Sequence, residues 1–594
     1  MSGLAAVLFP NNRSDGPATV GRMLASAPHR GTRSDVAVIG RCALGISSPE
    51  DAQEASLALQ NGFGVAFAGV LDNAAEMVLD LRRRGVKDQF PSTANLVASL
   101  FLHLGDAAVR DLRGIYSVVV TDGSHIKFFR DHLGLGTLFY RHDQSGTFVA
   151  TEVKQILAGS GIRREPNLEF LEKMLFGIDQ DDESPCSFLG VSRAPKASIT
   201  VATAERGPRS QRYWWPEELV ETARFSPEET AERFEEVMAR AVGRTVTGDD
   251  LIALSGGLDS PTIAAYAARL ASERGQRLSA LGMIYPDFPT CDEGGYIREV
   301  AEFLDIPLHT YQPPPPTLER LADWVQLYDG PWPVWLVPQA EDFYSHARAL
   351  GFRTILNGEM AEFVADMRRG LVPHLVWRGR LGAVASYLAN HRRQGKPLRR
   401  IGREFAGAFV PRAAMSFRRR SRPGVTIPAW IDSVRVADRD ADSVMATRHQ
   451  WRETQTQVIF GPTLVTDVFE ICQAASGVRV RMPWADVDLW EFFLSLPAEV
   501  KFPDGRMKPL VRDLMRTKIP DSIIDRKDKT VLNEFVIASI DYPSLRKWLL
   551  NPDQRIPGVN YGLLADQLER EDLDLFGYVW AKDLAGIQAF LAQW

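Results

Sequence analysis

A short glycine-rich segment, LSGGLDS at residues 254–260, carries the residue types that bind a polyphosphate. The apolar run at residues 251–254 predicts a buried strand, and Ser260 with Pro261 predicts the N-cap and first turn of a following helix. A strand, a tight loop and a helix in this order turn backbone N–H groups and the positive end of the helix toward an anion. The segment therefore predicts a phosphate-binding loop.

The side chains of this loop narrow the chemistry. Gly256 and Gly257 let the backbone approach a ligand closely, and Ser255 and Ser260 add hydroxyl groups. The Asp259 carboxylate would repel a bare phosphate, so the loop implies a hard cation such as Mg²⁺. Because no GxxxxGK[ST] segment accompanies the loop, we expect pyrophosphate release and not cleavage of the terminal phosphate.

Length and composition predict a multidomain soluble enzyme. With 594 residues the chain exceeds one ordinary core, while 45% hydrophobic and 24% charged residues are typical of globular enzymes. A net charge of -6 argues against general nucleic-acid binding, and no apolar run is long enough to span a membrane. Four cysteines without CxxC spacing and a poor signal-peptide pattern favour a reducing, cytoplasmic location.

Two domains of different class are expected. Strand-like runs at residues 3–9, 64–67, 115–121 and 147–151, with a helical stretch near 74–84, predict an α+β sandwich over residues 1–210. A linker at 211–225 ends before SPEE at Ser226, which predicts a capping box. Alternating helices and apolar runs, including 278–284 and 354–356, predict a parallel sheet within residues 226–594, with nucleotide at its carboxyl edge.

The glycine-rich loop and its following helix resemble the pyrophosphatase loop of the asparagine synthetase superfamily, whose members adenylate a carboxylate and pass it to an amine. Four N-terminal segments are similar in order to the glutamine amidotransferase domain of that family: HRG at 29–31, AGVLDN at 68–73, RDHLGLGTLFY at 130–140 and TEVKQIL at 151–157. This resemblance implies an Ntn-hydrolase-like αββα sandwich followed by an adenine-nucleotide alpha-hydrolase-like domain with a parallel sheet.

The N-terminal domain departs from the family at its catalytic positions. The family begins Met, Cys, Gly and uses the cysteine as nucleophile, whereas this chain has Ser2 before Gly3. A hydroxyl is far less nucleophilic near neutral pH than a partly ionised thiol. Ala68 replaces an oxyanion-stabilising asparagine and Thr93 replaces a glutamine-binding aspartate. We therefore expect a retained scaffold that is inactive as a glutaminase.

The synthetase residues are mostly preserved. NGEMAEF at 357–363 resembles the SGEGADE segment of the family, which implies Gly358 near the ribose, Glu359 as the base for the amine and Glu362 as a metal ligand. GRMKPLVR at 505–512 resembles the segment with an essential lysine, which implies that Lys508 stabilises the α-phosphate and the oxyanion. The segments at 478–492 and 519–529 flank it in the order of the family.

The resemblance therefore implies ATP and Mg²⁺ as cofactors, with Asp259 and Glu362 as metal ligands and Lys508 and Glu359 as catalytic residues. The implied nucleotide contacts are Leu254, Ser255, Gly256, Gly257, Asp259, Ser260, Met283 and Gly358.

Family members without the cysteine include β-lactam synthetases and lasso peptide cyclases. A basic insertion at about 368–438, with RRQGKPLRR at 392–400, FRRRSRP at 417–423 and IPAWID at 427–432, resembles the lasso cyclases. This implies a precursor core peptide as substrate, with a leader peptidase and a leader-recognition protein as partners. A β-lactam-synthetase-like enzyme, an ammonia-dependent asparagine synthetase and a non-catalytic peptide-binding scaffold are the alternatives, and the basic run alone is typical of a solvated face.

Overall fold

The computed structural model describes most of the 594-residue chain. The described residues are 2–11, 14–49, 55–177, 184–331, 337–393, 402, 405–406, 408–409, 427–436, 449–460, 464–527, 530–550 and 555–594. The arginine-rich residues 394–400 and 417–423 of the predicted basic insertion lie outside these ranges.

Two six-stranded sheets form the centre of the N-terminal domain. The first has the order β10-β8-β9-β1-β3-β2 and the second β12-β11-β7-β6-β5-β4, and the registered neighbours within each are antiparallel. Strands of the first sheet are β1 (Gly3–Leu8), β2 (Arg33–Ile39), β3 (Cys42–Ser48), β8 (Phe139–Asp143), β9 (Gly146–Ala150) and β10 (Ser192–Arg193). Strands of the second are β4 (Ala55–Gln60), β5 (Phe63–Leu71), β6 (Gly114–Thr121), β7 (His125–Arg130), β11 (Ser198–Thr203) and β12 (Arg209–Arg212).

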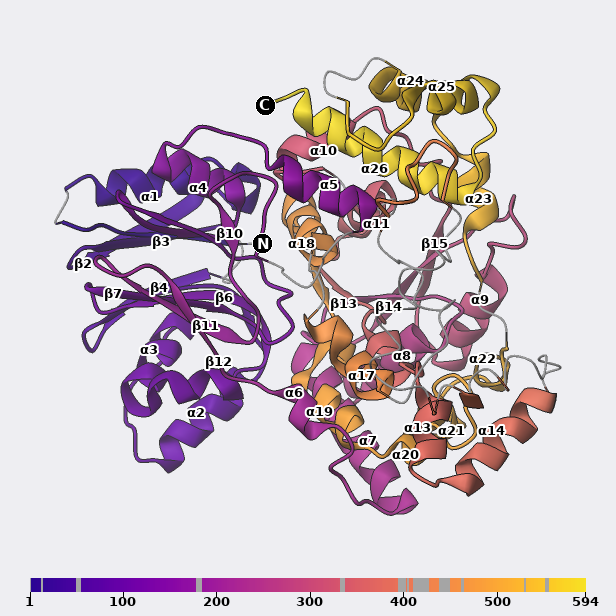
Figure 1. Ribbon diagram of the computed structural model, residues 1–594. Coiled ribbons are helices and arrows are strands. Elements are labelled where there is room, and N and C mark those ends of the chain that lie inside the picture. The colour runs from indigo at the N-terminus through magenta and orange to yellow at the C-terminus, as the bar shows by residue number, and fades with distance from the viewer. Residues whose placement is uncertain are drawn as a thin grey trace.

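Helices cover the outer face of each sheet, which completes an αββα sandwich (Figure 1). One layer contains α1 (Gly16–Ala25) and α4 (Val153–Ser160), and the other contains α2 (Ala74–Arg83) and α3 (Thr93–Leu104). Every residue of β1 is buried because this strand lies between a helix layer and the second sheet, which explains its continuous apolar sequence GLAAVL. The predicted α+β sandwich is confirmed.

The second domain is built on a five-stranded parallel sheet of order β15-β14-β13-β16-β17. Its strands are β13 (Asp250–Ala253), β14 (Ser279–Met283), β15 (Leu308–Tyr311), β16 (Thr354–Leu356) and β17 (Arg479–Arg481). The chain adds β14 and β15 on one side of β13 and β16 and β17 on the other. This topological switch point places a ligand crevice at the carboxyl end of β13, where the glycine-rich loop begins.

Helices surround this sheet (Figure 1). From the linker to β17 they are α6 (Pro216–Leu219), α7 (Pro227–Thr245), α8 (Asp259–Glu273), α9 (Gly294–Phe303), α10 (Leu321–Leu327), α11 (Val337–Ala349), α12 (Ala361–Ala365), α13 (Leu371–Trp377), α14 (Leu381–Arg393), α17 (Gln450–Phe460) and α18 (Leu464–Ser476). After β17 they are α19 (Val487–Ser495), α20 (Ala498–Lys501), α21 (Pro509–Met515), α22 (Asp521–Ile524), α23 (Asn533–Ala538), α24 (Tyr542–Leu549), α25 (Tyr561–Arg570) and α26 (Leu575–Leu591). Among the described helices, none is long and apolar enough to cross a membrane.

Two helix starts test the capping predictions. At α7 the capping box is confirmed, because Glu229 N donates to Ser226 Oγ at 3.1 Å and Ser226 N donates to Glu229 Oε2 at 2.8 Å. At α8 the predicted N-cap is wrong, because the helix begins at Asp259 and Leu258 is its N-cap. Ser260 lies inside the first turn, where its Oγ accepts a hydrogen bond from Ser255 N at 2.9 Å and closes the loop.

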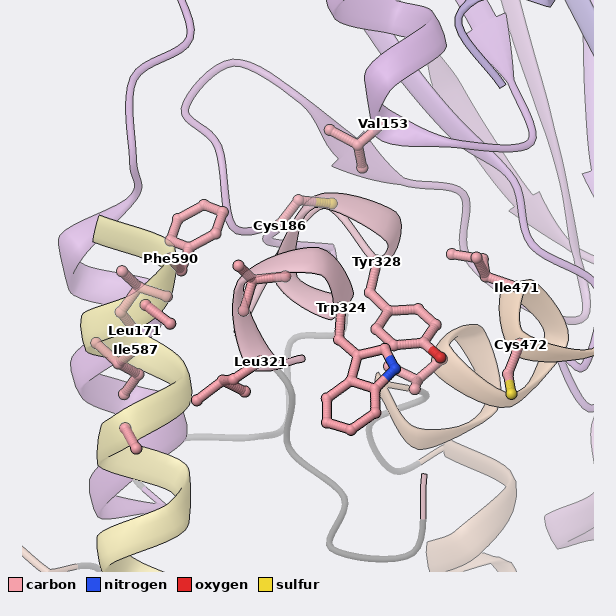
Figure 2. Packing of buried hydrophobic residues seen from close by; sticks show 14 of the residues in the cluster. Val153, Leu171, Cys186, Leu321, Trp324, Tyr328, Ile471, Cys472, Ile587 and Phe590 are labelled. Carbon is pink, nitrogen blue, oxygen red and sulfur yellow. The ribbon is translucent and has the colours of Figure 1, made fainter. Parts of the chain in front are cut away.

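The two domains share one apolar core. Val153 and Cys186 of the N-terminal region belong to the same buried cluster as Trp324 and Tyr328 of the second domain, and Phe590 of α26 extends it (Figure 2). Another N-terminal helix, α5 (Leu168–Phe176), packs against α26. All four cysteines are buried free thiols, so no disulfide contributes to the fold.

Candidate active site

The glycine-rich loop follows β13 and is held in a closed shape by its own hydroxyl groups. Ser255 N donates to Ser260 Oγ, and Gly257 N donates to Ser255 Oγ at 3.3 Å. A third donor, Gly256 N, bonds to Glu293 Oε2 at 2.9 Å. The loop therefore lies at the start of α8 with its backbone already hydrogen-bonded.

Gly358 brings the second predicted segment directly against this loop. A Cβ atom at Gly358 would lie 2.6 Å from Ser260 N and 2.9 Å from the carbonyl carbon of Asp259, so only glycine permits this approach. The next element, α12, begins after Met360, whose φ of 74° is in the left-handed region. The structure thus brings Gly358 and Glu359 to the mouth of the predicted phosphate site.

Lys508 reaches the loop from a distant part of the chain. It precedes α21 with a left-handed φ of 47°, and its Nζ lies 2.6 Å from both carboxylate oxygens of Asp259. Only 8% of Lys508 is exposed. The predicted cation and the predicted metal-binding carboxylate are therefore in direct contact.

Asp366 joins this pair, and sequence reasoning missed it. Its Oδ1 accepts a hydrogen bond from Lys508 N at 3.3 Å and lies 2.9 Å from Arg368 Nε. Burial raises the pKa of the Asp366 carboxyl, while Arg368 and Lys508 oppose that rise. Glu362, the predicted second metal ligand, lies on α12 one turn before Asp366, and its side chain is exposed. Asp366 could be recognised only from its contact with Lys508.

Glu359 lies where two cavities meet. The first, which we call the synthetase cavity, has a volume of about 350 Å³ and is lined by Leu254, Ser255 and Met283 among others. The second, the interdomain cavity, has a volume of about 60 Å³ and is lined by Ser2 and Ala68 among others. Glu359, Phe469 and Val480 border both cavities.

The environment of Glu359 suits a proton acceptor. Its side chain is accessible from the cavities but surrounded by protein, and this burial raises the pKa of the carboxyl, with a hydrogen bond involving Asn357 opposing the rise. Burial also raises the pKa of the neighbouring Tyr344 hydroxyl, and the Glu359 charge adds to that shift. A carboxyl with a raised pKa can accept a proton and release it nearer neutral pH.

The interdomain cavity shows what became of the N-terminal catalytic positions. Ser2 is 3% exposed, and its Oγ has no hydrogen-bond partner among the described residues. Beside it, the fully buried Arg30 donates to Ser2 O at 3.0 Å and to Glu470 Oε1 at 3.0 Å. Ala68 lines the same cavity, whereas Thr93, the first residue of α3, is not among the described residues that line it.

The carboxylate at the glycine-rich loop suits a magnesium ion that substrate phosphates also hold. Asp259 supplies hard carboxylate oxygens, and Mg²⁺ in nucleotide sites needs only one or two carboxylates besides phosphates and water. No group of three or more metal-binding side chains occurs within the described ranges. Asp259 would hold the ion together with substrate phosphates once Lys508 turns from the carboxylate to a phosphate.

Sequence comparisons agree with this architecture. The Asparagine synthase profile matches residues 233–569, more than half of the chain, and the Glutamine amidotransferase domain profile matches residues 1–215. Asparagine synthetase [glutamine-hydrolyzing] 3 of Bacillus subtilis (strain 168) is 22% identical over 491 residues, covering 78% of this chain and 74% of that protein.

Two further matches cover less of the chain. Amidase chry2 of Gibberella zeae is 26% identical over 236 residues, which is 37% of this chain and 34% of the amidase. A solved structure described as the allosteric regulatory enzyme of purine biosynthesis has a TM-score of 0.28 and 15% identity, covering 53% of this chain and 81% of that one.

Proposed function

Because the chain belongs to the asparagine synthase family of ATP-dependent amide-forming enzymes, we propose that it is a macrolactam synthetase of the lasso peptide cyclase type. The observation that carries the proposal is the contrast between its two cavities. Lys508 pairs with Asp259 at the glycine-rich loop and Glu359 borders the synthetase cavity, whereas Ser2 stands where the family has a thiol nucleophile. The amine must then come from a source other than glutamine.

The first step activates a carboxylate. An Asp or Glu side chain of a precursor core peptide attacks the α-phosphorus of ATP and expels pyrophosphate, which leaves an acyl adenylate. The Lys508 ammonium group, close to Asp259, is placed to move onto the α-phosphate as negative charge develops there. Magnesium at Asp259 supplies further positive charge to the phosphates when it is bound.

The second step forms the amide. The N-terminal α-amine of the same peptide attacks the acyl carbonyl, and AMP leaves. Glu359 takes the surplus proton from the amine. A hydrogen bond with Asn357 orients the Glu359 side chain. Since peptide α-amines have pKa values of about 7.7–8.0, a reactive neutral fraction exists near neutral pH and a mild base suffices.

The lining of the synthetase cavity favours a peptide over free aspartate. Aromatic side chains contribute to one wall, among them Tyr285, Phe343 and Tyr344. Among the described residues that line the cavity, none is Lys, Arg or His. Free aspartate carries a second carboxylate that would lack a cationic partner there, whereas peptide side chains can pack against the aromatic wall.

The proposed partners follow from this substrate. A leader peptidase must expose the α-amine of the core peptide, and a leader-recognition protein would deliver the precursor. We assign the reaction to the cytoplasm, where ATP and reduced thiols are available, and all four cysteines of this chain are thiols.

The test combines the protein with ATP, Mg²⁺, a precursor peptide and its leader peptidase. The expected product is one water lighter than the core peptide and appears with AMP. ADP without AMP would contradict the mechanism. Asparagine formation from aspartate and ammonium would identify the ammonia-dependent alternative, and closure of a four-membered ring in a small β-amino acid would identify the β-lactam-synthetase-like one. An unchanged cellular product after Lys508→Ala would identify a scaffold.

A further inference from the structure

Gly256 of the glycine-rich loop is held between a carboxylate and a guanidinium group. Its N–H donates to Glu293 Oε2 at 2.9 Å, and its carbonyl accepts a hydrogen bond from Arg526 Nη1 at 2.6 Å. The same Arg526 Nη1 lies 2.8 Å from Glu293 Oε1. The three groups form a closed ring of hydrogen bonds on one side of the loop.

The ring is tightly packed and only partly accessible. The Arg526 guanidinium lies 4.3 Å from the centre of the Tyr296 ring, and 11% of the Arg526 side chain and 19% of the Glu293 side chain are exposed. A Cβ atom at Gly256 would lie 2.8 Å from Tyr296 Cβ and 2.9 Å from Arg526 Nη1. Arg526 therefore contacts the loop itself and not only its surroundings.

These hydrogen bonds bear on ligand binding, because they occupy a loop N–H that a phosphate oxygen would otherwise use. A backbone N–H in a phosphate loop is a donor for a phosphate oxygen, yet here a carboxylate oxygen of Glu293 accepts from it. Lys508 and Asp259 form a similar pair at the same loop. Each of these two cations thus pairs with a carboxylate, which an incoming polyphosphate with its greater charge can replace.

We propose that Arg526 binds the β- and γ-phosphates of ATP and the pyrophosphate that leaves, and that Glu293 is an internal anion that those phosphates displace from Gly256 N. This inference rests on the proposed use of ATP at the loop. The planar guanidinium offers paired donors to phosphate oxygens, so Arg526 can exchange one anionic partner for another without leaving the loop.

Substitutions of the two partners have opposite expected effects. Arg526→Met removes a phosphate ligand, so the affinities for Mg·ATP and Mg·pyrophosphate should fall about 10- to 100-fold. Glu293→Gln removes the competing charge, so affinity for Mg·pyrophosphate should rise several-fold. If the pair only supported the loop structurally, both substitutions would weaken binding.

The experiment is calorimetric titration of the full-length chain with Mg·ATP, Mg·pyrophosphate and AMP. AMP lacks the β- and γ-phosphates, so Arg526→Met should change its affinity less than about twofold. Arg526→Lys keeps the charge and should retain most of the pyrophosphate affinity. Arg516→Met is the matched control, because Arg516 is 45% exposed and pairs with Asp521 and Asp525 on the surface. Thermal unfolding of each variant establishes that it is folded.

The outcomes separate the two proposals. If the unsubstituted chain binds neither Mg·ATP nor Mg·pyrophosphate, the proposed function and this inference both fail. If it binds them but Arg526→Met leaves pyrophosphate affinity unchanged, or Glu293→Gln weakens it as Arg526→Met does, the inference alone is overturned. Opposite shifts in the two variants, with AMP binding preserved, support it.

Discussion

The interdomain cavity at Ser2 and the glycine-rich loop at Asp259 both bring cations and carboxylates together, but in different ways. In the interdomain cavity Arg30 is fully buried and bonds at once to Glu152, Glu470, Thr137 and the Ser2 carbonyl. At the glycine-rich loop the Lys508 ammonium group pairs with Asp259, whose side chain is 30% exposed. The first arrangement leaves Arg30 no place for a ligand, whereas the second can be opened by one.

The difference shows that one charged site of the chain can connect the domains while another binds substrate. Several simultaneous partners fix a buried charge and connect the domains, since Glu470 belongs to α18 of the second domain and Arg30 to the first. A partly exposed partner such as Asp259 leaves the Lys508 charge able to bind substrate. Ser2 lines the interdomain cavity together with Arg30, and Glu359 borders both cavities.

The largest expected effect is the loss of stability when Arg30 is replaced. Arg30→Met leaves Glu152 and Glu470 without their shared cation, so the free energy of unfolding should fall by about 3–5 kcal/mol in chemical denaturation. Arg33→Met is the control, because Arg33 is 67% exposed and lies 4.0 Å from Asp35, and it should cost under about 0.5 kcal/mol. Similar losses in both variants would contradict the comparison.

Replacing Lys508, which pairs with Asp259, is expected to lower the rate of AMP formation. Lys508→Met should lower AMP formation in the presence of substrate about 10²- to 10³-fold, because the cation that stabilises the α-phosphate is lost. Lys518→Met is the matched control, since Lys518 also pairs with a carboxylate, Glu235, which belongs to α7 and not to the glycine-rich loop. Equal activity of the two variants would remove Lys508 from the mechanism.

Glu359 connects the two regions, and its raised pKa predicts a pH dependence. The base acts when ionised and the α-amine when neutral, so below the pKa of Glu359 the rate of amide formation should rise about 100-fold per pH unit. Above that pKa, which lies above the ordinary value for glutamate, the slope should fall to about tenfold per unit until the amine is neutral. Glu359→Gln should abolish the steeper limb and lower the plateau about 10²-fold. Pyrophosphate exchange, which needs no amine, should keep its own pH profile; if it shows the same limb, Glu359 acts earlier than proposed.

Ser2 provides the smallest expected effect. Because its hydroxyl has no partner among the described residues, Ser2→Ala should change the free energy of unfolding by under about 0.5 kcal/mol. The rate of amide formation should change less than about twofold. A tenfold loss in that assay would mean that Ser2 is a nucleophile and that the interdomain cavity is still a reaction site.

Local patterns predicted the fold well where they depend on neighbouring residues. The apolar run at 251–254 and the SPEE segment at Ser226 predicted β13 and the start of α7, because burial on both strand faces and capping act over a few positions. The start of α8 was placed wrongly. Ser260 has the composition of an N-cap, but its hydroxyl bonds back to Ser255 and the helix begins before it.

The sequence supplies the residue types of the candidate site, and the fold supplies their pairings. The contact of Lys508 with Asp259 joins positions 249 residues apart, and that of Arg526 with Gly256 joins positions 270 apart. Neither separation leaves a periodic signal in the sequence. Asp366, Glu293 and Arg526 looked like ordinary charged residues until the fold placed them around the loop.

The apolar core shared by both domains has a practical consequence for engineering. Cys186 and Phe590 belong to different domains, yet with Trp324 they form part of one buried cluster (Figure 2). Cutting the chain at the domain boundary would expose this surface on both halves and favour aggregation. Chimeras that combine this chain with a relative to change its specificity should therefore exchange only loops around the synthetase cavity and keep the N-terminal domain unchanged.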